Sequence, residues 1–248
     1  MVSMKQLRRF LLLVIACSAA LLHLAAADPG PRFENEIQAF IQADRVKPPL
    51  REGILFVGSS IFREWTNVTE MMAPLPVVNR AFGGSRTDDQ LARFDPVVLP
   101  HAPRIIVYYC GSNDIKEGRG PDAAFLDFKV FSERVRRIWP ATRLLFVSST
   151  RSLDRVDKWD RVDHYNGLVR AYCAETPLRR FIDINRALID ADGCPRTDLY
   201  RADKLHFHPA AYVAFTALIR PVLADEWRKA GAVKAVPIEP ATSGPVAP

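Results

Sequence analysis

Four short segments of this 248-residue chain hold residue types that could carry out acyl transfer. A Gly-Ser-Ser segment ends at Ser60, a Gly-Gly pair ends at Gly84, a Gly-Ser-Asn-Asp segment contains Asn113, and Asp203 precedes His206 by three positions. A serine hydroxyl becomes an effective nucleophile when an imidazole accepts its proton, and a carboxylate can orient that imidazole. A glycine N–H with no Cβ in the way and an asparagine amide can stabilise an oxyanion. The four segments together predict a serine nucleophile with its base, its orienting acid and its oxyanion donors.

Each segment also has an ordinary structural explanation. A serine after a strand commonly caps a helix, a Gly-Gly pair commonly forms a turn, and Asn or Asp often follows a strand as a turn residue. Two functional positions have rivals nearby, since Ser59 is an alternative nucleophile and His208 an alternative base. It is the occurrence of all four segments in one chain that favours the catalytic interpretation.

A metal site is a further alternative for the last segment. Asp203, His206 and His208 could ligate a metal ion, but the chain has no second cluster of His, Cys or carboxylate residues at ligand spacing. We therefore predict neither a metal nor a cofactor. The sequence allows a disulfide between Cys173 and Cys194 without requiring it.

Five apolar runs predict the strands that would carry these segments. Continuous apolar runs are typical of strands buried on both faces of a sheet, and they span residues 53–57, 76–79, 104–109, 143–147 and 180–184. Helical patterns cover residues 33–43, 125–138, 165–172 and 209–228. This alternation predicts a three-layer α/β/α sandwich with a five-stranded parallel sheet of flavodoxin-like order. The first three functional segments then follow strands at the edge where such sheets bind ligands.

The N-terminal segment has the pattern of a signal peptide. Lys5, Arg8 and Arg9 precede an apolar run, and residues 25–27 are three alanines. We predict a signal peptide at residues 1–27, a secreted or periplasmic protein, and no stable membrane span after cleavage. Two alternatives are an uncleaved membrane anchor and lipidation of Cys17, which ends a lipobox-like Val-Ile-Ala-Cys sequence.

The rest of the chain is predicted to form one domain at residues 28–230, followed by a disordered Pro/Ala-rich tail at 231–248. Residues 1–27 hold three basic and no acidic residues, so their removal lowers the formal net charge from +6 to +3. No stripe of Lys and Arg alternates with aromatic residues, and we therefore predict no nucleic-acid partner.

The four segments resemble the sequence blocks of the SGNH/GDSL hydrolases (GDSL-like lipases and acylhydrolases), over about residues 53–212. By this resemblance Ser60 is the nucleophile, while Asp203 and His206 complete the triad. The N–H groups of Ser60 and Gly84 and the side chain of Asn113 form the oxyanion hole. The Asp-x-x-His spacing favours this base over the alternative histidine. In the first block a serine replaces the usual aspartate, a variant that resembles a bacterial branch of the superfamily.

The resemblance implies an exported esterase or acylhydrolase that needs no cofactor. Its expected partner is a small-molecule, glycan or lipid ester. The charged residues of the 151–163 loop, which contains Trp159, favour an open, wet site and short acyl groups on a polar carrier. The alternative from another class is an inactive, exported carbohydrate- or lipid-binding module of the same fold.

Overall fold

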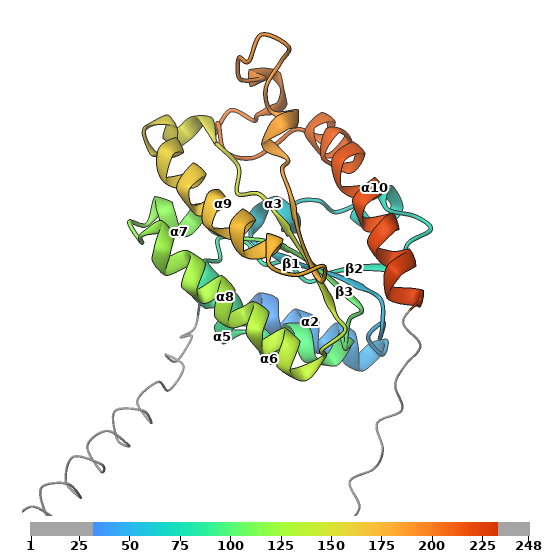
Figure 1. The fold of residues 1–248 in the computed structure, drawn as a ribbon. Helices are drawn as coiled ribbons and strands as arrows, with labels where there is room; N and C mark the ends of the chain where they lie inside the picture. The colour runs from blue at the N-terminus through green and yellow to red at the C-terminus, as the bar shows by residue number, and fades with distance from the viewer. Residues whose placement is uncertain (1–31, 233–248) are drawn as a thin grey trace, which may run out of the picture.

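A five-stranded parallel sheet forms the centre of the protein (Figure 1). The computed structural model describes residues 32–232. The strands are β1 Ile54–Gly58, β2 Val77–Asn79, β3 Ile105–Tyr109, β4 Arg143–Val147 and β5 Arg179–Ile182. Neighbouring strands pair in parallel and their spatial order is β2-β1-β3-β4-β5, which is the flavodoxin-like order.

Helices connect these strands and cover the sheet. The α-helices are α2 Glu34–Val46, α3 Ser60–Arg63, α4 Val68–Met71, α5 Thr87–Ala92, α6 Phe94–Val98, α7 Ser112–Lys116, α8 Pro121–Ile138, α9 Trp159–Ala174 and α10 Pro209–Ala232. Short 3-10 helices lie at η1 Leu99–His101, η2 Leu153–Lys158, η3 Asn185–Ala187 and η4 Thr197–Leu199. Figure 1 shows α10 on one side of the sheet and α8 and α9 on the other.

The apolar runs are continuous because the strands are buried on both faces. Successive residues of a strand point to opposite faces of a sheet. In β1, Ile54 and Phe56 pack in one apolar cluster with α3, α4 and α10. Leu55 and Val57 pack in the other cluster with α2, α6, α8 and α9. Each face of the strand therefore needs an apolar side chain.

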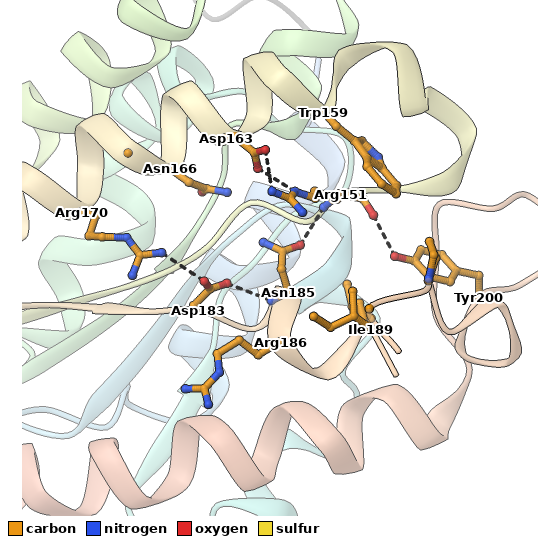
Figure 2. Close-up of a pocket in the computed structure, with 14 residues that line it drawn as sticks. Arg151, Trp159, Asp163, Asn166, Arg170, Asp183, Asn185, Arg186, Ile189 and Tyr200 are labelled. Atoms are coloured by element: carbon orange, nitrogen blue, oxygen red, sulfur yellow. Dashed lines mark hydrogen bonds and ion pairs between the residues drawn. The ribbon is translucent and has the colours of Figure 1, made fainter. Parts of the chain in front are cut away.

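The predicted three-layer α/β/α architecture is confirmed, with small differences in the bounds of elements. The fifth strand ends at Ile182 rather than at residue 184. Asp183 Oδ1 accepts hydrogen bonds from the Asn185 N–H (Figure 2) and from the Ser148 hydroxyl, and these bonds hold the chain where it leaves the sheet. The last helix continues to Ala232, so the first two residues of the predicted tail are helical instead.

Several predictions about the chain termini lie outside the described residues. These are the signal peptide, the alternative anchor, lipidation at Cys17 and the tail beyond residue 232. Within residues 32–232, we find no helix with both the length and the apolar character that a membrane span requires. The disulfide that the sequence allowed is not formed in this structure: Cys173 is a buried free thiol and Cys194 an exposed one.

A buried ion pair fixes α10 against the sheet. Arg143 Nε, on β4, donates a hydrogen bond to Glu226 Oε2, and these side chains are only 8% and 1% exposed. Arg180 Nε lies 2.9 Å from the other carboxylate oxygen. Because α10 begins directly after the segment that contains Asp203 and His206, the pair also helps to fix the position of that segment.

We expect Glu226→Ala to lower the free energy of unfolding by about 3–5 kcal/mol, because it leaves the Arg143 guanidinium buried without its partner. Asp225→Ala is the matched control, since Asp225 is 44% exposed and its ion pairs are at the surface. That variant should leave the free energy of unfolding almost unchanged, because exposed ion pairs contribute little. Urea unfolding measures both values, and equal losses would show that the buried pair has no special role.

Candidate active site

Ser60, His206 and Asp203 form one hydrogen-bonded chain. His206 Nε2 lies 3.0 Å from Ser60 Oγ, and His206 Nδ1 lies 2.6 Å from Asp203 Oδ2. An ionised carboxylate can only accept a hydrogen bond, so Nδ1 carries the imidazole proton. Nε2 is then free to accept the proton of the serine hydroxyl. This tautomer is the one that a general base for a serine nucleophile requires.

The Asp203 carboxyl group stays ionised throughout the neutral pH range. The hydrogen bond with the His206 side chain is the largest cause that lowers the pKa of Asp203, to about 2. The backbone N–H groups of Leu205 and His206 also donate to this carboxylate, at 3.1 and 2.9 Å. The group that orients the imidazole therefore keeps its charge whenever the imidazole is neutral.

A sharp turn at the end of β1 places Ser60. Gly58 has a φ of +152°, and a Cβ at this position would lie 2.1 Å from the carbonyl oxygen of Tyr109. Only glycine fits so close to the neighbouring strand. Ser59 follows in an extended conformation and is 1% exposed, whereas Ser60 begins α3 and is 9% exposed. Of the two candidate serines, Ser60 is the one whose hydroxyl contacts His206.

Backbone hydrogen bonds hold the 203–206 segment from two sides. The Lys204 residue has a φ of +58°, and its carbonyl accepts the N–H of Leu153 at 2.9 Å. The His206 carbonyl accepts the N–H of Arg201 at 2.8 Å. His208, the alternative base, is exposed, and its backbone N–H donates to the Leu199 carbonyl. The structure thus brings His206, and not His208, to the serine.

Two predicted oxyanion donors have free backbone N–H groups. Within residues 32–232, the N–H groups of Ser60 and Gly84 donate no hydrogen bond. Ser60 is the first residue of α3, where helix N–H groups lack intrahelical partners. Gly84 has a φ of +75°, and a Cβ at Gly83 would lie 2.6 Å from the guanidinium carbon of Arg63. Backbone conformation therefore requires the second glycine, whereas a side chain at the first would have to displace only the flexible end of Arg63.

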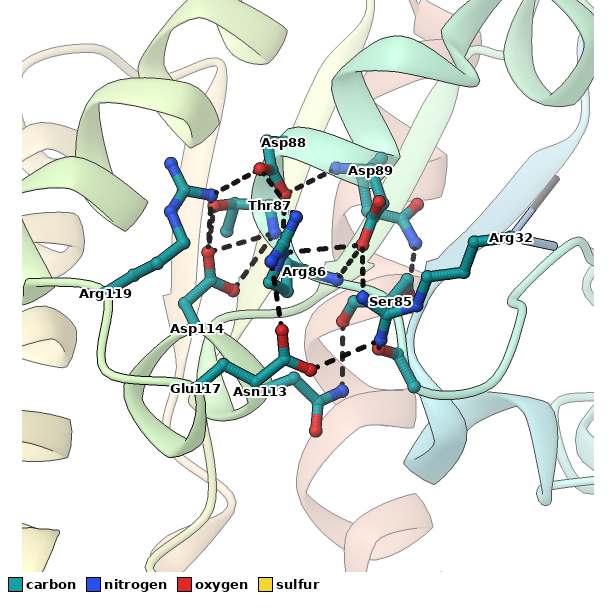
Figure 3. Close-up of polar contacts among 12 residues, drawn as sticks. Arg32, Ser85, Arg86, Thr87, Asp88, Asp89, Asn113, Asp114, Glu117 and Arg119 are labelled. Carbon is teal, nitrogen blue, oxygen red and sulfur yellow. Dashed lines mark hydrogen bonds and ion pairs between the residues drawn. The ribbon is translucent and has the colours of Figure 1, made fainter. Parts of the chain in front are cut away.

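The third predicted donor, Asn113, is tied to the same turn. Its Nδ2 donates to the Ser85 carbonyl at 3.0 Å, which leaves the second amide N–H for a ligand (Figure 3). The Ser85 hydroxyl accepts a hydrogen bond from Gln90 Nε2 at 2.7 Å. Gln90 Nε2 also lies 3.0 Å from the Gly58 carbonyl oxygen. These bonds join the turns that follow β1, β2 and β3.

A buried carboxylate, that of Asp114, stabilises the turn that contains Gly84 and Ser85. Asp114 is completely buried and accepts hydrogen bonds from the Thr87 N–H at 3.0 Å and the Thr87 hydroxyl at 2.6 Å (Figure 3). Arg119 Nη1 lies 3.1 Å away. Burial raises the pKa of Asp114 to about 6, and the bonds from Thr87 and the charge of Arg119 only partly oppose this effect. Asp114 therefore holds the start of α5, directly after the glycine turn.

Glu64 is a residue of the site that the sequence analysis missed. Its Oε1 lies 3.7 Å from His206 Nε2, and its Oε2 lies 2.7 Å from Arg201 Nη1. Glu64 follows Ser60 by four positions, a spacing that brings side chains together on a helix and that could have indicated the contact. A second carboxylate thus lies near the nitrogen that would receive the serine proton. Within the described residues, no group of three His, Cys, Asp or Glu side chains is placed to hold a metal ion.

Comparison with known proteins identifies the family. The GDSL-like Lipase/Acylhydrolase family matches residues 57–214 of the chain. The match spans more than half of the sequence and includes all the predicted site residues. The protein therefore belongs to the GDSL-like lipase/acylhydrolase family. A search of curated proteins finds no match.

Solved structures show the same fold at low sequence identity. A Streptococcus pneumonia protein provisionally described as a platelet activating factor has a TM-score of 0.67 and 21% identity, over 84% of this chain and 99% of that one. A GDSL-like lipase from Bacteroides thetaiotaomicron has a TM-score of 0.63 and 17% identity, over 76% and 97%. A carbohydrate esterase family 3 protein from Talaromyces cellulolyticus has a TM-score of 0.57 and 16% identity, over 71% and 98%.

The raised pKa of Asp114 predicts a pH-dependent contribution to stability. Its folded-state pKa of about 6 lies above the ordinary value of 3.8, so the folded protein binds this proton more tightly than the unfolded chain does. Protonated Asp114 therefore stabilises the folded state relative to the unfolded chain. This stabilisation is fully present below about pH 4 and is lost as the pH rises through about 6. The difference between a pKa of 3.8 in the unfolded chain and one of about 6 in the folded protein corresponds to about 3 kcal/mol.

Between about pH 4 and pH 7, the wild-type protein should therefore lose up to about 3 kcal/mol of unfolding free energy relative to Asp114→Asn. Urea unfolding of both proteins at the two pH values measures this difference. A difference that does not change with pH would mean that Asp114 titrates normally in the folded protein.

Proposed function

We propose that the protein is an exported serine esterase that hydrolyses carboxylic esters with Ser60, His206 and Asp203. The observation that carries the proposal is their hydrogen-bonded chain, with distances of 3.0 and 2.6 Å, beside unpaired N–H groups. Family membership and the fold shared with a carbohydrate esterase support ester hydrolysis in general. Export rests on the signal-peptide pattern of residues 1–27.

The first half of the reaction forms an acyl-enzyme. Ser60 Oγ attacks the ester carbonyl carbon while His206 Nε2 takes the hydroxyl proton. The carbonyl oxygen becomes an anion, which the N–H groups of Ser60 and Gly84 and the amide of Asn113 stabilise. The ionised Asp203 stabilises the imidazolium. His206 then gives the proton to the leaving alcohol oxygen as the ester C–O bond breaks.

The second half of the reaction regenerates the serine. A water molecule attacks the acyl carbon, and His206 Nε2 takes one of its protons. The same oxyanion donors stabilise the second tetrahedral intermediate. When the bond to Ser60 Oγ breaks, His206 returns the proton to that oxygen, and the carboxylic acid is released.

A groove beside the triad favours short acyl groups on a polar carrier. It has a volume of about 510 Å³, and it is lined by both charged and apolar side chains, among them Glu64, Met71, Arg201, Phe207 and Tyr212. A long acyl chain would bring apolar surface against these charges, which costs free energy. A polar carrier group can instead bind them with hydrogen bonds.

Hydrolysis of p-nitrophenyl acetate tests the proposal. We expect Asn113→Ala to lower kcat on the order of 10²–10³-fold with a smaller change in KM, because the amide acts on the oxyanion of the transition state. Ser60→Ala should lose the triad-dependent activity, whereas Ser59→Ala should retain most of it.

Circular dichroism and urea unfolding of each variant serve as folding controls. Unchanged turnover of Asn113→Ala would remove this residue from the oxyanion hole. If the folded wild-type protein hydrolysed no activated ester, the esterase proposal would fail and the binding-module alternative would replace it.

A further inference from the structure

A second cavity lies apart from the triad, at the far edge of the sheet. It has a volume of about 380 Å³ and lies between α9, the ends of β4 and β5, and the segment that follows β5 (Figure 2). None of Ser60, Asp203 and His206 lines it. Part of the 151–163 loop, which we expected to shape the acyl site, lines this cavity instead. Its size is in the range of small-molecule binding sites.

Ion pairs give the cavity fixed polar walls. Arg151 donates two hydrogen bonds to Asp163, from Nε at 2.7 Å and from Nη2 at 2.6 Å. Arg170 Nη2 donates to Asp183 at 3.1 Å. These side chains are between 29% and 57% exposed, so their remaining N–H groups and carboxylate lone pairs are open to a ligand. These walls suit a ligand with several hydroxyl groups, and Leu188, Ile189 and Pro195 add apolar surface beside them.

One cation of the cavity has no partner among residues 32–232. Arg186, on η3, is exposed and forms no ion pair or hydrogen bond with any other residue that the structure describes. Because the arginines at 151 and 170 are paired with carboxylates, the cavity carries one excess positive charge. An unpaired guanidinium is well suited to a carboxylate, which it can bind through two parallel hydrogen bonds.

A helix glycine keeps the cavity open. Gly167 lies in the interior of α9, where glycine is the least favourable residue after proline. A Cβ at this position would meet no atom within 4 Å, so packing does not require the glycine. Gly167 lines the cavity, and any larger side chain would reduce the space for a ligand.

Two aromatic residues form the end of the cavity nearest the triad segment. Figure 2 shows Trp159 extending from α9 toward Arg151 and Tyr200. Trp159 Nε1 donates to the Ser152 carbonyl at 2.8 Å, and the Tyr200 hydroxyl donates to the Arg151 carbonyl at 2.8 Å. Trp159 is half-buried, and its ring offers apolar surface to the C–H face of a sugar. Tyr200 is only 6% exposed and packs against Phe207, so it closes this end of the cavity.

This end of the cavity is linked directly to the catalytic segment. Tyr200 precedes Arg201, whose N–H donates to the His206 carbonyl at 2.8 Å. A neighbouring hollow, lined by Tyr200, Arg201 and Lys204, adjoins this end of the cavity, and a bound carrier molecule would extend through it toward the triad.

We propose that this cavity is a carrier-binding subsite for an acidic sugar, a pyranose that bears a carboxylate. Arg186 binds the carboxylate, the ion-paired walls bind the hydroxyl groups, and Trp159 contacts the apolar face of the sugar ring. The sugar's role as carrier of the ester rests on the proposed function, whereas its binding does not.

Isothermal titration calorimetry with trigalacturonic acid tests the subsite, because this probe contains no ester and needs no catalysis. Wild-type protein and Ser60→Ala should bind it equally. Arg186→Ala should bind it roughly ten- to a hundred-fold more weakly, the effect of losing a charge-assisted hydrogen bond. Arg137→Ala is the matched control, since Arg137 is an exposed arginine near the C-terminal end of α8 and does not line the cavity.

A second variant fills the cavity without disturbing the fold. Gly167→Gln should keep the hydrolysis of p-nitrophenyl acetate and the melting temperature, and it should lose trigalacturonate binding. The neutral trisaccharide maltotriose should bind at least tenfold more weakly than trigalacturonate. The proposal is overturned if trigalacturonate does not bind, if maltotriose binds equally well, or if Arg186→Ala binds like Arg137→Ala. None of these results would bear on ester hydrolysis, which is measured separately.

Discussion

The hydrogen bond between His206 Nε2 and Ser60 Oγ joins residues that are 146 positions apart, and the site depends on it. It forms only if the turn after β1 and the segment before α10 arrive at the same edge of the sheet. The first requirement is met by Gly58, which packs against β3 where no other residue fits. The second is met by backbone bonds to the 203–206 segment and by the Arg143–Glu226 pair beneath α10.

The oxyanion donors are fixed by a different mechanism, since polar side chains rather than apolar packing connect their turns. Gln90 joins the turns after β1 and β2, and Asn113 joins those after β2 and β3. The fully buried Asp114 carboxylate also belongs to this network, because it accepts a hydrogen bond from the Thr87 hydroxyl. Such a network can hold donors rigidly because each polar group has a partner. Electrostatic stabilisation of an oxyanion requires this kind of preorganisation.

The sequence predicted the architecture because both faces of a parallel strand are buried, which makes its apolar runs continuous. Through the resemblance to the SGNH/GDSL sequence blocks, it also predicted which serine, histidine and aspartate come together. It could not predict contacts that depend on how separate elements pack. Glu64 near His206 and the unpaired Arg186 are examples, because their environments involve segments distant in sequence. Asp114 looked like a local turn or capping residue, yet it binds the start of a different helix.

Labelling with a fluorophosphonate probe tests the central claim most directly, because the probe reacts with activated serines and requires no knowledge of the substrate. Intact-mass and peptide analysis of the protein should show one adduct, located on Ser60, and the rate of labelling should fall when His206 is replaced by alanine. An adduct on another residue would contradict the assignment of the nucleophile. The absence of any adduct on the folded protein would contradict the serine-esterase account as a whole.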